Sequence, residues 1–412
     1  MRIAIIGGGA AGMTTAYLLN NHHHVTLFEK QPILGGNIRT LNKNVTDVDL
    51  DPTIQLDNGV IEFQQDKFVL FHKLMKKLGV RVEPIRGGST TLYLANGQYI
   101  SSPGAIRDSQ LDLWERIGAY SKLLPIVFSY CTFLHRTRNP GDWQNRPIAD
   151  FWSGHRWRTW QRMLLMYAYS IPYAQIDDVP AEVGAEILRQ SGYGTAWTRV
   201  VGGVYSYFES MLRMFRGEIQ MNAQIDAIHR TADGVLIKML SGYTHTFDKV
   251  IFAVPPDQVL ELLADPTTNE LQRFAPWQAN HVTTIVHTDT SFYKRYGVNF
   301  FTEFDLFEKN EGRDGGYNAY LNRLCGLTDV HTPHYSLAYN LEEWIAPKNV
   351  VHRQNHHTPR YTTEAFRSRQ EIIATNGINQ TYHAGAYLGN GLHEGAVSSA
   401  LTVSQLLDGD TI

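Results

Sequence analysis

The chain begins with hydrophobic runs separated by glycine-rich and polar turns, and this pattern predicts a strand, a helix and a second strand. Residues 2–6 form a short apolar run rich in β-branched side chains, which is typical of a buried strand. Residues 10–19 are predicted to form a helix, and residues 25–29 a second strand. Gly7, Gly9 and Gly12 stand at the junction of the first strand and the helix. The start of the chain is therefore predicted to be a β-α-β unit.

These glycines have the spacing G-x-G-x-x-G, and each has a physical task. Gly7 allows the tight turn, Gly9 lets a pyrophosphate approach the backbone, and Gly12 lets the helix pack close to the strand. The helix directs its free N–H groups and its positive end at the phosphates. Glu29 ends the second strand, where a carboxylate accepts hydrogen bonds from the adenosine ribose. The unit predicts a dinucleotide site; the alternative is a glycine-rich turn of purely structural use.

The middle of the chain is predicted to be helical. Residues 65–78 carry apolar side chains at helical spacing, and Gly79 follows as a C-cap. Residues 105–207 are mostly helical and rich in Trp, Tyr and Leu, so we interpret them as an inserted substrate domain. Residues 123–134 are the longest apolar stretch, which is too short for a membrane span. We favour a core helix there over the lining of an apolar entry.

Strands are predicted elsewhere from apolar runs bounded by turn signals. The first is a hairpin at 91–101 around Asn96-Gly97. Strands at 218–228 and 235–240 are joined by Asp233-Gly234, and a strand at 248–256 ends in two prolines. Mixed strands follow in 266–350, and a strand at 382–387 precedes a helix that ends near 407. The alternation predicts an α/β fold, and 412 residues are expected to form two domains.

Composition and charge exclude several classes of function. The net charge is −3 and no basic stripe stands out, so the sequence does not predict a nucleic-acid partner. The two cysteines, Cys131 and Cys325, are far apart and predict neither a disulfide framework nor a zinc site. The histidine tract at 22–24 is interpreted as a solvated turn, and no metal site is predicted. The N-terminal apolar run lacks a cleavage region, so a cytoplasmic protein is expected.

A second glycine pair, Gly35-Gly36, follows Glu29 closely, with Arg39 and Thr40 behind it. Such a pair lets backbone approach the same pyrophosphate from its other side. Here the chain resembles the flavin-containing amine oxidase superfamily, whose members carry a glycine pair followed by a basic residue and a Ser or Thr. Asn37 stands where arginine is usual in that family, and the arginine falls at Arg39. The resemblance implies a phosphate contact that is made differently.

Two later blocks extend the resemblance in the expected order. Residues 56–61 resemble a turn whose backbone reaches the flavin ring, and Ile225 matches the residue that packs on the adenine. Residues 391–396 resemble the family's last motif, in which a helix N-terminus stabilises the negative charge of the reduced flavin by about 0.5–2 kcal/mol. Many members have an acid at the position of Ala386, and this chain lacks that contact.

The resemblance implies FAD as the cofactor. It is expected to be non-covalent, because neither cysteine lies in the C-terminal block, where some amine oxidases attach FAD. No catalytic side chain is predicted. The expected cofactor-binding residues are Gly7, Gly9, Ala10, Ala11, Gly12, Glu29, Lys30, Gly36, Asn37, Arg39, Asn58, Gly59, Val60, Ile225, Ala253, Gly385, Ala386, Gly391, Leu392 and His393.

The expected fold is an α/β, amine-oxidase-like one with a Rossmann-type FAD-binding domain and a mixed α+β substrate domain. The FAD-binding domain is predicted to be discontinuous, over 1–85, 200–265 and 360–412, and the substrate domain to fill 86–199 and 266–359. The chain most resembles a bacterial branch known as predicted FAD/NAD-binding oxidoreductases. It has weaker similarity to the polyenoic fatty acid isomerases, at residues 177–181 and 202–203.

The function expected from this resemblance is that of an FAD-dependent oxidoreductase, in which a hydride moves from a substrate C–H to flavin N5. The apolar, aromatic insert and the weaker similarity favour a small lipophilic substrate, with no nucleic acid and no transmembrane segment. Two alternatives stay open. One is an FAD-dependent isomerase that returns the hydride to another carbon of a polyunsaturated fatty acid, and the other is a flavin-binding protein without turnover. The sequence makes no prediction about the oligomeric state.

Overall fold

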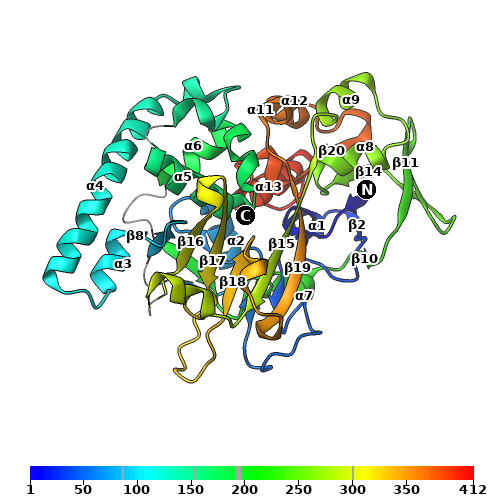
Figure 1. Cartoon of the computed structure of the whole chain (residues 1–412). Coiled ribbons are helices and arrows are strands. Elements are labelled where there is room, and N and C mark those ends of the chain that lie inside the picture. The colour runs from blue at the N-terminus through cyan, green and yellow to red at the C-terminus, as the bar shows by residue number, and fades with distance from the viewer. Residues whose placement is uncertain (86–87, 153–154, 191–195, 299–300) are drawn as a thin grey trace.

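A five-stranded parallel sheet lies beside the N-terminus, at the right of Figure 1. In this computed structural model residues 1–85, 88–152, 155–190, 196–298 and 301–412 are described. The strand order is β10 (Glu218–Gln220), β2 (His24–Phe28), β1 (Arg2–Ile6), β14 (Lys249–Phe252) and β20 (Thr381–His383). Apolar side chains of β1 and β2 are fully buried, as their continuous hydrophobic runs predict. The sheet thus joins segments that lie hundreds of residues apart in sequence.

Helix α1 (Ala10–Leu19) follows β1 and packs against α13 (His393–Leu406), the last helix of the chain. Gly12 makes the close approach of α1 to the strand possible. A Cβ atom at this position would lie 1.9 Å from the carbonyl oxygen of Gly7 and 3.1 Å from the Cβ of Ala253. The task that the sequence assigned to Gly12, close packing of helix on strand, is therefore confirmed.

We expect Gly12→Ala to lower the free energy of unfolding by about 3 kcal/mol, because its methyl group overlaps backbone that cannot move away. The matched control is Gly118→Ala in α4 (Leu113–Arg136), where a Cβ meets nothing within 4 Å. That substitution should stabilise the chain by about 0.5–1 kcal/mol through helix propensity. Urea unfolding followed by circular dichroism measures both, and similar midpoints for the two variants would contradict the packing argument.

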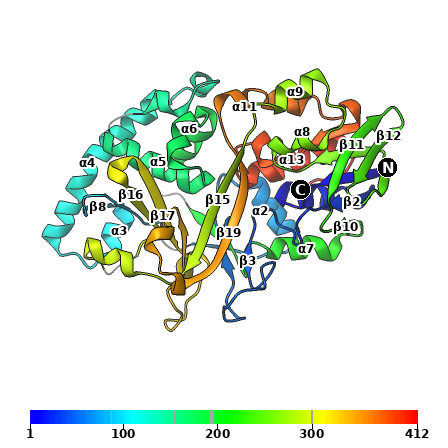
Figure 2. The same ribbon diagram turned by 45° about the vertical axis from the view of Figure 1, so that its right-hand side comes forward.

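A seven-stranded mixed sheet forms the second layer (Figure 2). Its order is β19 (Val350–Pro359), β15 (Ala279–His287), β18 (Ser336–Tyr339), β17 (Asp314–Tyr320), β16 (Phe304–Lys309), β7 (Thr90–Tyr93) and β8 (Tyr99–Ser101). Only β16 and β7 are parallel neighbours within it. The predicted hairpin at 91–101 is confirmed, because β7 pairs antiparallel with β8 around Gly97, which has a φ of +84°.

A third sheet, β11 (Ile225–Thr231), β12 (Gly234–Met239) and β13 (Thr244–Phe247), corrects one prediction. Residues 218–228 were expected to form a single strand, but the chain turns at Asn222, whose φ is +55°. Residues before the turn join the parallel sheet as β10, and those after it start β11. The strand β13 was not predicted.

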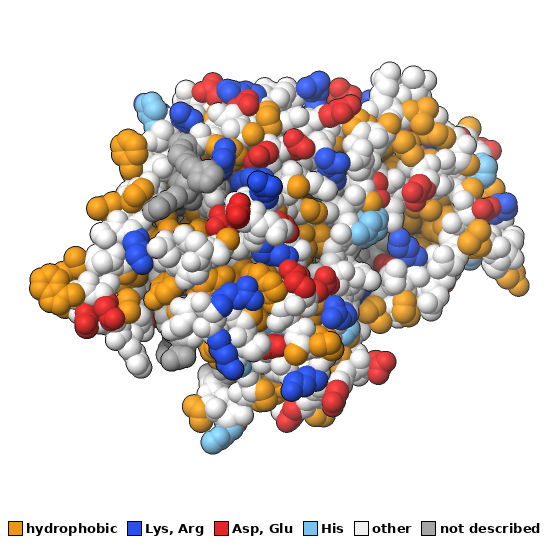
Figure 3. Space-filling view, in the orientation of Figure 1, with side chains coloured by type: hydrophobic (Ala, Val, Ile, Leu, Met, Phe, Trp, Pro, Cys, Tyr) orange, Lys and Arg blue, Asp and Glu red, His pale blue; other side chains and the backbone are white. Residues whose placement is uncertain are grey.

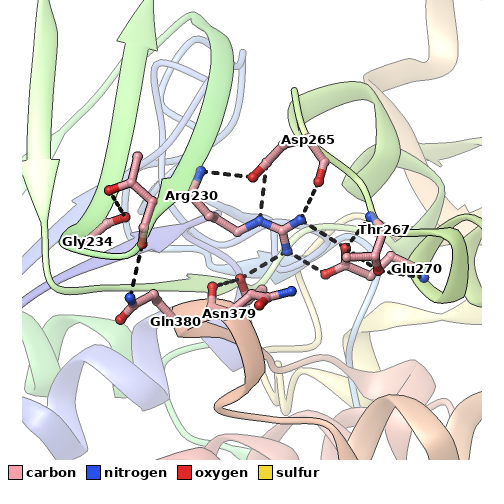
Figure 4. A network of polar contacts seen from close by, with 9 residues as sticks. Arg230, Gly234, Asp265, Thr267, Glu270, Asn379 and Gln380 are labelled. Carbon is pink, nitrogen blue, oxygen red and sulfur yellow. Dashed lines mark hydrogen bonds and ion pairs between the residues drawn. The ribbon is translucent and has the colours of Figure 1, made fainter.

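Arg230 connects this third sheet, through hydrogen bonds and ion pairs, to the helical segment that follows β14 (Figure 4). Its guanidinium donates to Asp265 and, through Nη2, to Glu270 at 2.9 Å. Burial alone would raise the pKa of Glu270, but hydrogen bonds from Arg230 and Thr267 lower it to about 2. The ion pair therefore stays charged at neutral pH and holds β11 next to α9 (Thr268–Phe274).

The predicted helical insert is confirmed in its main part, but the position of its longest helix is not the one expected. It contains α3 (Pro103–Asp108), α4, α5 (His155–Tyr169) and α6 (Ala181–Gln190). Helix α4 lies at the outer edge of the molecule, and only Leu123, Ile126 and Phe133 of it are buried. The prediction of a core helix at 123–134 is therefore wrong. Composition alone does not separate a core helix from an apolar helix at the surface.

The remaining elements are short and connect the layers. They are the strands β3 (Thr40–Leu41), β4 (Leu56–Asp57), β5 (Phe63–Gln64), β6 (Val82–Pro84) and β9 (Trp197–Val200), and the helices α2 (Val69–Lys77), α7 (Ser206–Met214), α8 (Val259–Leu262), α10 (Leu321–Leu324), α11 (Thr363–Arg367) and α12 (Arg369–Ala374). All five parallel strands come from the segments 1–85, 200–265 and 360–412. The exact domain boundaries stay a prediction.

Candidate functional site

One large cavity of about 1540 Å³ runs from the parallel sheet to the helical insert. Of the residues predicted to bind the cofactor, all except Gly12 and Asn58 line it. Those that do are Gly7, Gly9, Ala10, Ala11, Glu29, Lys30, Gly36, Asn37, Arg39, Gly59, Val60, Ile225, Ala253, Gly385, Ala386, Gly391, Leu392 and His393. Their role toward a cofactor stays a prediction, but the structure brings these segments together around one space.

Gly12 and Asn58 lie behind the wall of the cavity. Gly12 packs against the backbone of Gly7, as described above. Asn58 is fully buried, and its side-chain oxygen accepts a hydrogen bond from the hydroxyl of Thr284 on β15. Its backbone N–H donates to the carbonyl of Arg39 at 2.7 Å. Asn58 therefore connects the segment at Arg39 to the seven-stranded sheet beside the site.

The two glycine turns touch each other at one end of the cavity. The N–H of Gly35 donates to the carbonyl of Gly8 at 2.9 Å, and a Cβ atom at Gly36 would lie 3.1 Å from the Cα of Gly9. The first turn of α1 has Gly9 as its N-cap and no side-chain hydrogen bond. Bare backbone and a helix N-terminus thus face the same space, which suits a bound anion.

Glu29 is held at the end of β2 by backbone donors. One carboxylate oxygen accepts from the N–H of Gly8 at 2.7 Å, and the other accepts from the N–H of Gln31 at 2.8 Å. The side chain is buried yet lines the cavity. Each oxygen keeps a second lone pair, so the carboxylate can accept further hydrogen bonds from a ligand.

Arg39 is a buried cation in the cavity wall. Its Nη1 donates to the carbonyl of Ile38 at 3.0 Å, while its Nε has no hydrogen-bond partner. Burial lowers the pKa of the guanidinium, and the nearby carboxylate of Glu29 raises it. A desolvated guanidinium with an unused donor fits an anionic group such as a phosphate. Asn37, at the position where the family has arginine, instead donates its side-chain amide to the carbonyl of His357 at 3.1 Å.

The loop before α13 is fixed by hydrogen bonds at the cavity wall. The side-chain oxygen of Asn390 accepts from the N–H groups of Leu392 at 3.0 Å and Gly395 at 3.1 Å. The hydroxyl of Tyr169 on α5 donates to the carbonyl of Asn390 at 3.0 Å. Gly391 has a φ of +79°, and a Cβ there would lie 3.0 Å from the ring of Tyr169. Helix α13 therefore starts at a fixed position in the cavity wall.

His393 and Glu394, the first residues of α13, direct their side chains away from the cavity. The Nε2 of His393 lies 2.8 Å from the hydroxyl of Tyr207, and burial lowers the pKa of the imidazole to about 3. The carboxylate of Glu394 accepts from the N–H groups of Leu70 and Phe71 in the first turn of α2. At the start of α13 only the backbone is therefore available to a ligand. The neutral ring of His393 packs behind this backbone, on the side away from the cavity.

The other end of the cavity is an apolar chamber between the seven-stranded sheet and helices α4 to α6. We define this chamber by its aliphatic and aromatic lining, which consists of Leu123, Ile126, Trp160, Leu164, Tyr167, Ala168, Ile187, Phe304, Leu306, Tyr317 and Leu337. Few charged side chains reach it. A chamber of this kind binds the hydrophobic part of a ligand and excludes water from it.

Glu62 is an ionisable group of this cavity that the sequence did not predict. Its Oε1 accepts a hydrogen bond from the hydroxyl of Tyr167 at 3.3 Å, and its buried Oε2 has no partner. Burial raises the pKa of the carboxyl to about 8; the hydrogen bond from Tyr167 lowers it, and the charge of Glu303 raises it further. The carboxyl is therefore largely protonated at neutral pH. Its place directly after residues 56–61, which resemble a flavin-contacting turn, is the signal that could have identified it.

Comparison with known proteins agrees with this geometry. Residues 5–66 match the NAD(P)-binding Rossmann-like domain, and residues 184–325 match the family of flavin containing amine oxidoreductases. No curated protein matches the sequence significantly. These matches cover the first two glycine turns and the middle of the chain.

Solved structures with the same fold cover almost the whole chain. A putrescine oxidase with bound putrescine has a TM-score of 0.66 at 13% identity, over 99% of both chains. A CLA-producing fatty acid isomerase from P. acnes has a TM-score of 0.69 at 15% identity, over 99% of this chain and 98% of its own. Cyclohexylamine oxidase from Brevibacterium oxydans IH-35A has a TM-score of 0.64 at 15% identity, over 99% of both. The predicted α/β, amine-oxidase-like fold is thus confirmed.

Proposed function

We propose that this chain, a flavoenzyme of the amine oxidase type by its sequence matches and fold, binds FAD without a covalent bond and acts on a lipophilic substrate. One observation carries the proposal. A single cavity joins the touching glycine turns, which suit a dinucleotide, to a chamber with apolar walls. A cofactor in the first part and a hydrophobic substrate in the second would meet inside one cavity.

Three features of the cavity fit FAD. The uncapped N-terminus of α1 and the bare glycine backbone suit the pyrophosphate, and the unused Nε of Arg39 supplies a cationic donor. The backbone start of α13 can stabilise negative charge on a reduced ring. Neither Cys131 nor Cys325 lines the cavity, which supports a non-covalent bond.

Bound flavin would supply the hydride acceptor for oxidation of a substrate C–H bond. Residues of the chain would bind the substrate, exclude water and hold a proton. The apolar chamber binds and orients the substrate chain and keeps water away from the reacting carbon. Glu62, neutral at pH 7 and hydrogen-bonded to Tyr167, holds a proton at the chamber wall, where it can donate to a polar group of the substrate.

Two other functions compete with oxidation. In a double-bond isomerase of polyunsaturated fatty acids the hydride returns to another carbon of the same substrate, and the fold similarity to a fatty acid isomerase favours this candidate. In a non-catalytic flavin-binding protein the cofactor would bind without turnover, and Ala386, where many family members have an acid, is the position that favours it.

The first test is the visible absorption spectrum of the purified protein, repeated after heat denaturation and filtration. We expect flavin bands and FAD in the filtrate; a colourless protein that takes up no added FAD would contradict the cofactor proposal. Anaerobic mixing with linoleic acid should then bleach the bands if the chain oxidises lipids. Conjugated-diene absorbance without net bleaching would indicate the isomerase. Bleaching by putrescine but by no lipid would refute the lipophilic substrate, and no reaction with either would favour the non-catalytic protein.

A further inference from the structure

Helix α4 presents an apolar stripe to solvent along its whole length. Side chains spaced three or four residues apart share one face of this 24-residue helix. They are Leu113, Ile117, Tyr120, Leu124, Val127 and Phe128, and all are exposed, Phe128 by 76%. Figure 3 shows hydrophobic side chains gathered on the outer edge of the molecule, where Figure 1 places α4. A contiguous row of exposed apolar side chains such as this one normally marks an interaction site.

The opposite face of α4 closes the cavity. Leu123 and Ile126 are buried and line the apolar chamber, and Tyr130 lines it one turn further along. Val127 belongs to both sides, since it lines the cavity and is 54% exposed. The helix is therefore apolar around most of its circumference, and a single layer of its side chains separates the chamber from the outer stripe. The stripe is thus continuous with the wall of the cavity.

The charges around the stripe select among possible occupants. The chain as a whole has a net charge of −3, yet the segment from 112 to 138, which carries the stripe, has four basic side chains and two acidic ones. The acids, Asp112 and Glu115, form the N-terminal capping box of α4. The bases are Arg116, Lys122, Arg136 and Arg138. A second copy of this chain would bring like charges together at such a surface. An apolar stripe with basic residues instead complements a bilayer that contains anionic lipid.

The geometry favours a helix that lies flat on a membrane over one that crosses it. By length and composition α4 is the one helix in the described part of the chain that could span a bilayer. However, it contains Pro125, it packs against α5 and β8, and its buried side belongs to the protein core. A spanning helix would have to give up these contacts.

We propose that the exposed stripe of α4 is a membrane-contact surface that lies in the interface of an anionic lipid bilayer. The proposal of membrane binding rests only on the exposed stripe of α4 and on the charged side chains near it. That the bilayer also delivers a lipophilic substrate through the thin wall at Val127 rests on the proposed function.

The test is co-sedimentation of the full-length protein with vesicles of phosphatidylcholine and phosphatidylglycerol at 7:3, and with phosphatidylcholine alone. We expect binding to the anionic vesicles that weakens at 0.5 M salt. The variant Leu113→Gln, Leu124→Gln, Phe128→Gln should bind at least about tenfold more weakly, because it loses apolar area that enters the bilayer. None of these three side chains lines the cavity. The matched control, Leu240→Gln, Tyr243→Gln, Val330→Gln, removes equally exposed apolar side chains elsewhere and should bind like the wild type.

Circular dichroism of both variants is the control for folding, and we expect the spectrum of the wild type. The proposal is overturned if the wild type stays in the supernatant with every vesicle, or if the α4 variant binds as well as the control. It is also overturned if light scattering shows a dimer that the α4 variant alone abolishes, with no vesicle binding. The measured quantity is the amount of protein that sediments with the vesicles, which does not depend on flavin content or turnover. If the proposed function failed, the result of this experiment would therefore be unchanged.

Discussion

Arg39→Met should weaken FAD binding about 100-fold and at the same time make the cofactor-free protein more stable. The guanidinium is buried, and its Nε has no partner, so the empty site contains a desolvated cation that is only partly compensated by Glu29. Methionine removes that cost, because it packs without a charge. Charge-assisted hydrogen bonds to phosphate contribute about 3 kcal/mol together, which corresponds to about 100-fold in Kd.

Two measurements on the same samples check this result. Fluorescence titration of cofactor-free protein with FAD gives Kd, and thermal unfolding without FAD gives the change in stability. The control is Arg313→Met, an exposed arginine away from the cavity, which should change neither quantity. Unchanged FAD affinity in the Arg39 variant would show that the phosphate is bound elsewhere. Loss of both affinity and stability would show that Arg39 serves the fold.

Glu62→Gln should stabilise the folded chain at pH 7 by on the order of 3 kcal/mol and leave it unchanged near pH 4. Burial raises the pKa of this carboxyl to about 8 in the folded chain, above its value in the unfolded chain. Ionisation of Glu62 therefore destabilises the folded state. This destabilisation is absent below the pKa of the unfolded chain, grows as the pH rises toward 8, and is constant above pH 8. Glutamine has no ionisable carboxyl. The gain in the free energy of unfolding of Glu62→Gln must therefore grow over the same range of pH.

Urea unfolding at pH 4, 7 and 9 measures the gain. Glu261→Gln, an exposed carboxyl that lines the same cavity, is the control and should change stability by less than about 0.5 kcal/mol at each pH. If Glu62 donates its proton during turnover, flavin reduction by substrate should also slow above about pH 8 in the wild type and lose this transition in Glu62→Gln. A gain in stability that is equal at pH 4 and 9 would contradict the raised pKa.

The cofactor end of the cavity was predictable because its geometry is local. A glycine turn between a strand and a helix needs particular residues at particular spacings, and Gly7, Gly9 and Gly36 satisfy that need within the first forty residues. Lining residues from later segments, such as Ile225 and Gly391, were found through the family resemblance and not through any local rule.

The substrate end was not predictable because long-range packing creates it. Glu62 acquires its raised pKa from burial and from Tyr167, which lies 105 residues further along the chain. Helix α4 has the apolar pattern of a core helix, but its neighbours cover only one side of it. Likewise, polar and apolar residues alternate through 218–228 as in a single strand, while the turn at Asn222 sends the two halves into different sheets.

The buried guanidinium of Arg39 also links the abundance of the protein to the supply of its ligand. A chain with an empty site retains the full desolvation cost and unfolds more often than a loaded one. Cellular proteases remove unfolded chains, so a tightly bound anionic cofactor at 1,000 times its Kd, which adds about 4 kcal/mol, would protect the loaded form. When the cofactor is scarce, turnover by proteolysis would thus clear the unloaded chains first.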